Sequence, residues 1–357
     1  GKPNDKIPNI FRKDLGFPVS DRNVYVPTYP NGALINHQML DNMFADFGDE
    51  LSTLESRRDM AYAIQTQTQA QVLDLILTAS AMSGKKQVVL SGGYGLNCVA
   101  NYSYLDTLNE AGIELYVEPN SNDAGTAMGA ALLGWYKVSE STDPRPRDIF
   151  LGPQYNYTES DIQEKVEQLK GSISEATDDD VVELMTNKNI VAIFQGRSEN
   201  GPRALGNRSL MFDPTFKDGK DFVNLVKRRE YFRPFAGSIL KEDVHEWFDL
   251  KGMDETPHMM YAVNCKDGVE EKIPSIIHVD GTCRIQTVSE EDNPLYYKVI
   301  KAFKEKTGIP IIFNTSFNLG GAPLVETLDD ALMTLADSDI EYLYLPEYNK
   351  LVNISNI

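Results

Sequence analysis

A basic stretch with interspersed glycines, from Phe194 to Phe235, constrains this chain more than any other feature. It reads FQGRSENGPRALGNRSL and, after a spacer, VKRREYFRPFA. Between Arg197 and Arg233 nine Lys/Arg stand against five Asp/Glu, whereas the whole chain has a formal net charge of −19. Arginine presents a fixed fork of donors, and glycine lets backbone N–H groups approach a ligand. The stretch therefore indicates either a site for an anion with several oxygens or a surface network of salt bridges.

Composition limits the classes of protein to consider. At 357 residues, with 41% hydrophobic and 24% charged residues, the chain suits a globular protein of two domains. It has no apolar run of bilayer length, no signal-peptide core and no metal-ligand spacing among its three cysteines. We therefore expect a cytoplasmic protein without disulfides or a membrane partner. The acidic net charge also argues against a broad surface for nucleic acid.

The pattern along the chain predicts an α/β part followed by an α+β part. A polar, proline-containing linker, Thr142–Pro146, divides them, which gives domains at residues 1–141 and 151–357 with a linker at 142–150. Hydrophobic periodicity predicts helices and strands on both sides of the linker. The expected helices are 53–82, 98–112, 124–136, 159–169, 178–187, 218–227, 295–306 and 328–336, and the expected strands include 87–91, 113–120, 189–195, 234–240, 258–265, 283–289 and 308–314.

A glycine turn follows the first predicted strand. Gly92, Gly93 and Asn97 lie between this strand and a helix, the arrangement in which backbone N–H groups bind a phosphate. A turn that serves packing alone would look the same. Further along, Asp123 stands where the chain enters a helix of small residues. An aspartate there is either an N-cap or a metal or phosphate ligand at the end of a strand.

A third polar group follows the predicted strand 308–314. Asn314, Ser316 and Asn318 alternate along the sequence, so we expect their side chains on one face, ready to hydrogen-bond a planar ligand. The alternative is a turn rich in Asn and Ser.

Taken together, these blocks resemble the NodU/CmcH family of O-carbamoyltransferases. SGGYGLNCVAN and NSNDAGTAMGAA resemble its sugar-kinase and actin-like (ASKHA) domain. GRSENGPRALGNRSL, KRREYFRPFA and FNTSFN, in this order, resemble its C-terminal domain, which is similar to the YrdC proteins of tRNA threonylcarbamoylation. The resemblance implies part of an ASKHA-like lobe followed by a YrdC-like mixed-sheet domain.

The family resemblance implies an ATP-dependent carbamoyltransferase. Carbamoyl phosphate and ATP would give carbamoyl adenylate in the YrdC-like domain, and the carbamoyl group would pass to a hydroxyl acceptor at the ASKHA-like domain. Arginine, lysine and backbone N–H groups can stabilise the charge that develops on the phosphoryl oxygens. The catalytic residues implied are Arg203, Lys227, Arg229 and Arg233, and the substrate-binding residues are Arg197, Arg284, Asn314, Ser316 and Asn318, with Glu199 as an orienting residue. Gly92, Gly93 and Asn97 match the family's nucleotide segment.

The metal site implied by the resemblance is incomplete. Asp123 matches an aspartate that holds iron, but the family's pair of histidines four residues apart is absent among His37, His245, His258 and His278. We therefore expect the N-terminal lobe to be missing and little metal on Asp123, with Fe²⁺ bound only if that lobe is supplied and Mg²⁺ accompanying ATP. This chain would then retain the first half-reaction. Two alternatives are an RNA-modifying protein of the threonylcarbamoylation type and a non-catalytic or split-enzyme subunit that needs a partner lobe.

Overall fold

The computed structural model describes residues 1–4, 53–140 and 148–354. The chain divides into two compact units, one comprising residues 1–89 and 103–116 and the other residues 90–102 and 117–357. The linker predicted at 142–150 falls mostly outside the described residues. Among the helices that the structure describes, none combines the length and the apolar character needed to cross a bilayer.

The first unit is built around α2 (Leu54–Ser83), a helix of 30 residues. Thr53 caps its start by accepting the backbone N–H of Ser56 over 3.1 Å, and Gly84 ends it with a φ of 68°. The unit also contains most of the two-stranded sheet of β1 (Gln87–Leu90) and β2 (Glu114–Val117) and part of α3 (Cys98–Glu110). The sequence predicted these four elements within a few residues.

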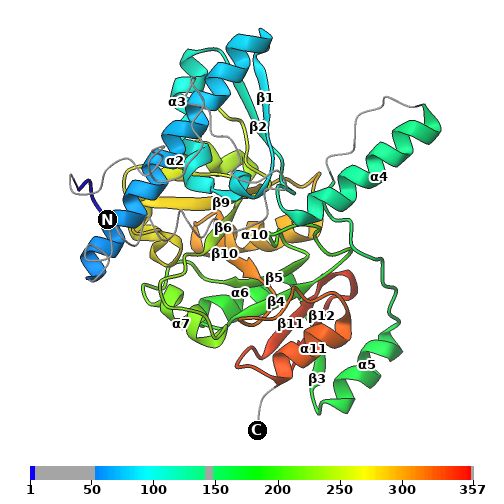
Figure 1. Ribbon diagram of the computed structural model, residues 1–357. Coiled ribbons are helices and arrows are strands. Elements are labelled where there is room, and N and C mark those ends of the chain that lie inside the picture. Colours follow the sequence, from blue (N-terminus) through cyan, green and yellow to red (C-terminus); the bar gives the residue numbers. More distant parts are fainter. Residues whose placement is uncertain (5–52, 141–147, 355–357) are drawn as a thin grey trace. The chain divides into compact units, whose positions relative to one another are not determined.

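The second unit contains a ten-stranded mixed sheet in the order β3-β12-β11-β4-β5-β10-β6-β9-β8-β7 (Figure 1). The pairs β11/β4 and β6/β9 are parallel, and the remaining pairs are antiparallel. This confirms the expectation of a mixed sheet in the C-terminal part. The strands are β3 (Ser172–Glu175), β4 (Val191–Phe194), β5 (Arg208–Phe212), β6 (Ala236–Leu240), β7 (Phe248–Asp249), β8 (Ala262–Cys265), β9 (Thr282–Val288), β10 (Ile311–Ser316), β11 (Tyr342–Leu345) and β12 (Lys350–Asn353).

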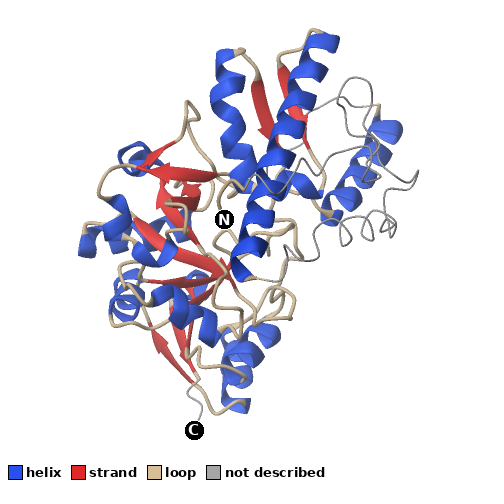
Figure 2. Cartoon of the chain, turned by 60° about the vertical axis from the view of Figure 1, so that its left-hand side comes forward, coloured by secondary structure: helices blue, strands red, loops and turns tan. Residues whose placement is uncertain are grey.

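Several helices of this unit, among them α6 and α10, pack on the sheet (Figure 2). The helices of the unit after α3 are α4 (Asp123–Ser139), α5 (Glu159–Gln168), α6 (Asp178–Thr186), α7 (Gly219–Val226), α8 (Val244–Trp247), α9 (Val269–Lys272), α10 (Pro294–Thr307) and α11 (Leu328–Ala336), with short 3₁₀ turns η2 (Gly93–Leu96), η3 (Lys241–Asp243), η4 (Pro274–Ile276) and η5 (Pro346–Tyr348). Capping boxes begin α5, α6 and α11, at the starts that hydrophobic periodicity predicted.

The two faces of the central strands pack against different helices. Met211 and Ile312 lie in one core with Val299 and Phe303 of α10, and α6 joins the same core. Phe212 faces the opposite side, where its ring is 5.5 Å from that of Phe222 on α7. Because successive side chains alternate along a strand, Asn314 shares the α10 side of the sheet with Ile312. The polar end of β10 therefore emerges just beyond the apolar core.

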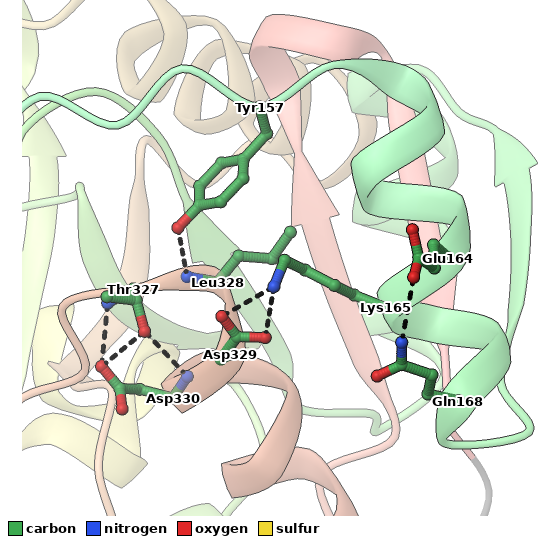
Figure 3. A network of polar contacts seen from close by, with 8 residues as sticks. All are labelled: Tyr157, Glu164, Lys165, Gln168, Thr327, Leu328, Asp329 and Asp330. Atoms are coloured by element: carbon green, nitrogen blue, oxygen red, sulfur yellow. Dashed lines mark hydrogen bonds and ion pairs between the residues drawn. The ribbon is translucent and has the colours of Figure 1, made fainter.

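The start of α11 is fixed by contacts with the segment around α5 (Figure 3). The Tyr157 hydroxyl accepts the N–H of Leu328 over 3.0 Å, and Lys165 donates to both carboxylate oxygens of Asp329 over 2.7 and 2.8 Å. Thr327 and Asp330 complete the capping box. Together these contacts anchor the far end of the loop 317–327, which follows β10.

Candidate functional site

The glycine-containing part of the basic stretch is the loop between β4 and β5, two adjacent antiparallel strands. Side chains satisfy many of its polar backbone groups. The carbonyls of residues 204, 205 and 206 accept from the side chains of Asn314, Gln286 and Gln195 over 3.2, 2.9 and 2.8 Å. The N–H of Gly206 donates to Ser209 Oγ over 3.0 Å. The loop is therefore held in one conformation from several strands.

Glu199 is the centre of this arrangement. One carboxylate oxygen, Oε1, accepts the N–H groups of Leu205, Asn207 and Arg208 over 2.7, 2.9 and 3.3 Å. The side chain is 6% exposed, and its other oxygen has no partner among the described residues. Glu199 therefore orients the loop backbone, whereas the sequence suggested that it orients an arginine.

Arg208 anchors the base of the loop. It is fully buried, with its guanidinium 3.6 Å from the centre of the Phe194 ring. The guanidinium donates to four backbone carbonyls, those of Gln195, Gly196, Asn207 and Glu326. Burial lowers its pKa, and the charge of Glu199 opposes this effect. Arg208 thus ties the loop after β4 to the loop before α11.

The loop places Arg203 beside Arg284 of β9. Arg203 donates to the carbonyl of Leu96 over 3.3 Å and to the sulfur of Cys98 over 3.4 Å, and Arg284 also hydrogen-bonds Cys98. Burial, and next the charge of Arg203, lower the pKa of Arg284 to about 10. The Nε atoms of both arginines are buried without a partner in the described part of the chain. Two neighbouring guanidiniums with unused donors favour an anion here.

Asn314 contacts the loop residue next to Arg203 and lies on the same face of the sheet as Arg284. Its amide nitrogen donates to the carbonyl of Ala204 and to Ser238 Oγ over 3.2 and 2.9 Å, and its oxygen is buried without a described partner. In register, Asn314 of β10 stands opposite Ala236 of β6, which stands opposite Arg284 of β9. Residues directly opposite share a face, so Asn314 and Arg284 point to the same side of the sheet.

A pocket of about 660 Å³ opens beyond the end of β10. Four predicted site residues line it, namely Arg229, Arg233, Ser316 and Asn318. Residues that the sequence did not single out complete the lining: Arg228, Glu230, Leu319, Gly320 and Gly321. Asn314 and Ser316 are two positions apart on one face of β10, roughly 7 Å along a strand. The pocket and the Arg203–Arg284 pair are therefore neighbours.

Lys227 lies under the pocket and is not among its lining residues. The side chain is fully buried, and its ammonium donates to the carbonyl of Ser316 and to the carbonyl and the side-chain oxygen of Asn318, the last two over 2.8 and 3.2 Å. Its own carbonyl accepts the N–H of Gly320 over 2.7 Å. Burial, and next the charge of Arg229, hold the pKa of Lys227 well below its usual value. The lysine shapes the loop after β10.

The two predicted arginines on the rim differ in their surroundings. Arg229 is half-buried, and burial followed by repulsion from Arg233 lowers its pKa. Arg233 is exposed and donates to both carboxylate oxygens of Glu230 over 2.5 and 3.2 Å, which raises its pKa. Glu230 is the one carboxylate in the lining, against three arginines, so the pocket keeps a positive surplus.

The other predicted residues lie apart from this pocket. Arg197 donates to the carbonyls of Leu151 and Gly152 over 3.0 and 2.6 Å. Gly92 and Gly93 are exposed, and Gly92 has a φ of 98°. Asn97 accepts the N–H of Ala100 over 3.1 Å and so caps the start of α3. This turn still adjoins the arginine pair, because Leu96 at its end accepts from Arg203.

Asp123 is exposed and is the first residue of α4, while Asn122 occupies the N-cap position. An acidic residue in the first turn of a helix is stabilised by the helix dipole. Within residues 1–4, 53–140 and 148–354, no group of three His, Cys, Asp or Glu could hold a metal ion. Iron prefers several such ligands, so the residues present do not fit it.

Sequence reasoning missed several residues of this site. Cys98 has no signal in its spacing, and only the fold brings it to Arg203. Ser238, Gln286 and Tyr296 form a buried network with Asn314, in which Ser238 Oγ is 2.8 Å from Gln286 and 3.0 Å from the Tyr296 hydroxyl. These residues lie on three different elements, so no local pattern in the sequence joins them.

Comparison with known proteins adds independent information. The family model described as "Carbamoyltransferase C-terminus" matches residues 182–350, and that described as "Carbamoyltransferase N-terminus" matches residues 1–132. Nodulation protein NolO of Bradyrhizobium diazoefficiens is 36% identical over 301 residues, which cover 81% of this chain and 54% of that protein. Nodulation protein NolNO of Sinorhizobium fredii is 36% identical over 304 residues, covering 82% and 44%.

The chain thus spans about half the length of the curated relatives it matches. Among solved structures, full-length HypF in its phosphate- and nucleotide-bound form is similar at 18% identity with a TM-score of 0.35. That match covers 52% of this chain and 22% of HypF.

Proposed function

The chain belongs to the carbamoyltransferase family, and we propose that it activates carbamoyl phosphate with ATP at the pocket beyond β10. The observation behind this proposal is the composition of the pocket. Arg228, Arg229 and Arg233 face a single carboxylate, and the loop that contains Asn318 and Gly320 completes the lining. Such a lining suits phosphoryl oxygens, and about 660 Å³ accommodates a ligand of nucleotide size.

Membership of the carbamoyltransferase family and the arginines that line the pocket both support the following reaction. Hydrolysis of carbamoyl phosphate gives carbamate and phosphate. A carbamate oxygen then attacks the α-phosphorus of ATP, forming a new P–O bond while the α–β anhydride bond breaks and pyrophosphate leaves. Fixed guanidiniums stabilise the negative charge that develops on the phosphoryl oxygens. The product is carbamoyl adenylate, whose carbamoyl group would go to a hydroxyl acceptor.

Magnesium would enter this reaction with the phosphates of ATP. The pocket itself offers it one carboxylate, Glu230, which is already paired with Arg233 over 2.5 Å. The residues of this chain therefore bind and orient the oxyanions. Transfer of the carbamoyl group to the acceptor is a separate, later step. Any partner lobe would act in that later step.

Release of pyrophosphate that depends on carbamoyl phosphate tests the proposal. The purified chain is incubated with α-labelled ATP and magnesium, with and without carbamoyl phosphate, and labelled carbamoyl adenylate is separated from ATP. Arg229→Ala should lower the rate about a hundredfold. Lys217→Ala, which removes one positive charge from an exposed position, is the matched control and should leave the rate unchanged. ATP binding without any product dependent on carbamoyl phosphate would overturn the proposal.

A further inference from the structure

Two large exposed aromatic side chains come from a turn between two residues that line the pocket. Tyr231 and Phe232 are 75% and 65% exposed, and they lie in the chain between the lining residues Glu230 and Arg233. Their rings meet edge to face with centroids 5.8 Å apart. Exposed aromatic rings that lie together often mark a surface that binds a ligand or another protein.

The backbone beneath these rings is fixed. The N–H of Arg233 donates to the carbonyl of Glu230 over 3.1 Å, so Tyr231 and Phe232 occupy the two central positions of a turn. The ion pair between Glu230 and Arg233 closes the same turn through both carboxylate oxygens. A turn held in this way presents the rings without the entropy loss of ordering a loose loop on binding.

A buried residue holds the turn from below. The amide nitrogen of Asn224, a residue 1% exposed on α7, donates to the carbonyls of Tyr231 and Arg233 over 3.4 and 3.0 Å. The carbonyl of Asn224 in turn accepts the N–H of Arg229 over 2.9 Å. Asn224 thus fixes the aromatic turn through its side chain and the backbone of Arg229 through its own carbonyl. The contacts of Asn224 therefore fix the position of the two rings relative to Arg229.

The ligand that fits has an anionic end and a flat aromatic end. Its anionic part faces Arg228, Arg229 and Arg233, while its flat part can stack on a ring at the rim. The pocket is concave and of small-molecule size, and the chain's net charge of −19 opposes a nucleic-acid strand. A mononucleotide with several phosphates combines these properties.

We propose that Tyr231 and Phe232 form the base-binding surface of the nucleotide site, with the base stacked on a ring and the phosphates in the arginine pocket. This inference rests on the proposed function and adds the residues that recognise the nucleoside. Stacking accepts any base because every base has a π face. The surface should therefore bind ATP and GTP with similar strength and leave discrimination to other groups.

Isothermal titration with ATP and with inorganic tripolyphosphate, which has no base, tests the inference. The double variant Tyr231→Leu with Phe232→Leu keeps apolar bulk but removes both π faces. Its affinity for ATP should fall about ten- to a hundredfold, while its affinity for tripolyphosphate stays within about twofold. Tyr231→Phe should bind ATP like the wild type. Trp135→Leu removes an exposed aromatic ring from α4 and is the matched control.

The outcomes separate this inference from the proposed function. Equal ATP affinity in the wild type and the double leucine variant would overturn the base-binding surface alone. The same result together with a change in sedimentation would show that the turn contacts a second copy instead. If ATP binding depends on the rings but carbamoyl phosphate releases no pyrophosphate, the proposed reaction fails and the base-binding surface stands. A wild type that binds tripolyphosphate but no ATP overturns both.

Discussion

The Oε1 atom of Glu199 accepts the backbone N–H of Leu205 over 2.7 Å, so the carboxylate lies inside the loop that it belongs to. The same oxygen receives the N–H groups of Asn207 and Arg208. A single oxygen thus replaces the backbone partners that a regular turn would provide. Its position decides where Arg203, two residues before Leu205, is held.

Replacing Glu199 should unfold the protein more easily. Glu199→Ala leaves three buried N–H groups without an acceptor, and each such group costs about 1–3 kcal/mol. We expect the free energy of unfolding, measured by urea titration, to fall by at least about 2 kcal/mol. Glu291→Ala, at an exposed position, should stay within about 0.5 kcal/mol of the wild type. A Glu199→Ala protein of unchanged stability would show that water can replace the carboxylate.

Two glycines of the sequence motifs should respond differently to alanine. At Gly206, with a φ of 114°, a Cβ would lie 2.4 Å from the Tyr296 ring. Gly206→Ala should therefore destabilise the protein by about 1–3 kcal/mol or more. At Gly93 nothing lies within 4 Å of a Cβ, so Gly93→Ala should change stability by less than about 1 kcal/mol. Thermal unfolding of the two variants side by side measures the difference, and equal losses would contradict this reading.

Local patterns predicted much of the fold. Hydrophobic periodicity located α5, α6 and α11, and alternation or apolar runs located β4, β6, β9 and β10. Strand β5 was not predicted. All five of its residues are buried, but the strand begins with an arginine, so its sequence does not read as an apolar run. Nothing in a local window shows that Arg208 will stack on Phe194 and satisfy four carbonyls. A buried arginine depends on partners from distant parts of the chain.

The candidate site was predictable to the level of its motifs. The motifs of the family resemblance included Arg229, Arg233, Ser316 and Asn318, which line one pocket. The roles within a motif were not predictable from spacing, because they depend on which side chain faces inward. Lys227 and Arg229 are two residues apart, yet the first lies under the pocket and the second lines it.

Arg197 and Arg229 should contribute unequally to phosphate binding. The guanidinium of Arg197 already donates to the carbonyls of Leu151 and Gly152, whereas that of Arg229 lines the pocket. We expect Arg229→Ala to weaken binding of tripolyphosphate by about tenfold or more, and Arg197→Ala to leave it within about twofold. Titration calorimetry at fixed salt compares the two. A stronger effect of Arg197→Ala would mean that its carbonyl contacts are exchanged for the ligand.

Iron should not bind stoichiometrically to this chain. Asp123 is a single exposed carboxylate, and the described residues offer no cluster of three metal-binding side chains. One oxygen ligand is too few for a stable site. After incubation with Fe²⁺ without oxygen and desalting, elemental analysis should find the same low content in the wild type and in Asp123→Asn. One equivalent of iron that is lost in Asp123→Asn would contradict this prediction.

The stability contribution of Lys227 should depend on pH. Because the pKa of Lys227 is well below its usual value in the folded protein, chiefly through burial, the unfolded chain binds this proton more tightly. Between the folded pKa and the ordinary value of about 10.4, the unfolded state therefore holds more protons, and the free energy of unfolding rises with pH. In Lys227→Met this contribution is missing. The difference in unfolding free energy, wild type minus variant, should then grow as the pH rises from neutral toward that ordinary value.

Urea unfolding at a series of pH values measures that difference. Lys227→Met also leaves the carbonyls of Ser316 and Asn318 without a donor, so the variant should be less stable than the wild type when that pH is reached. Lys217→Met, at an exposed position, controls for the introduction of a methionine. If the wild type loses stability relative to Lys227→Met as the pH rises, the ammonium is held more tightly in the folded protein than in the unfolded chain. The three hydrogen bonds to Ser316 and Asn318 would then outweigh the cost of burial.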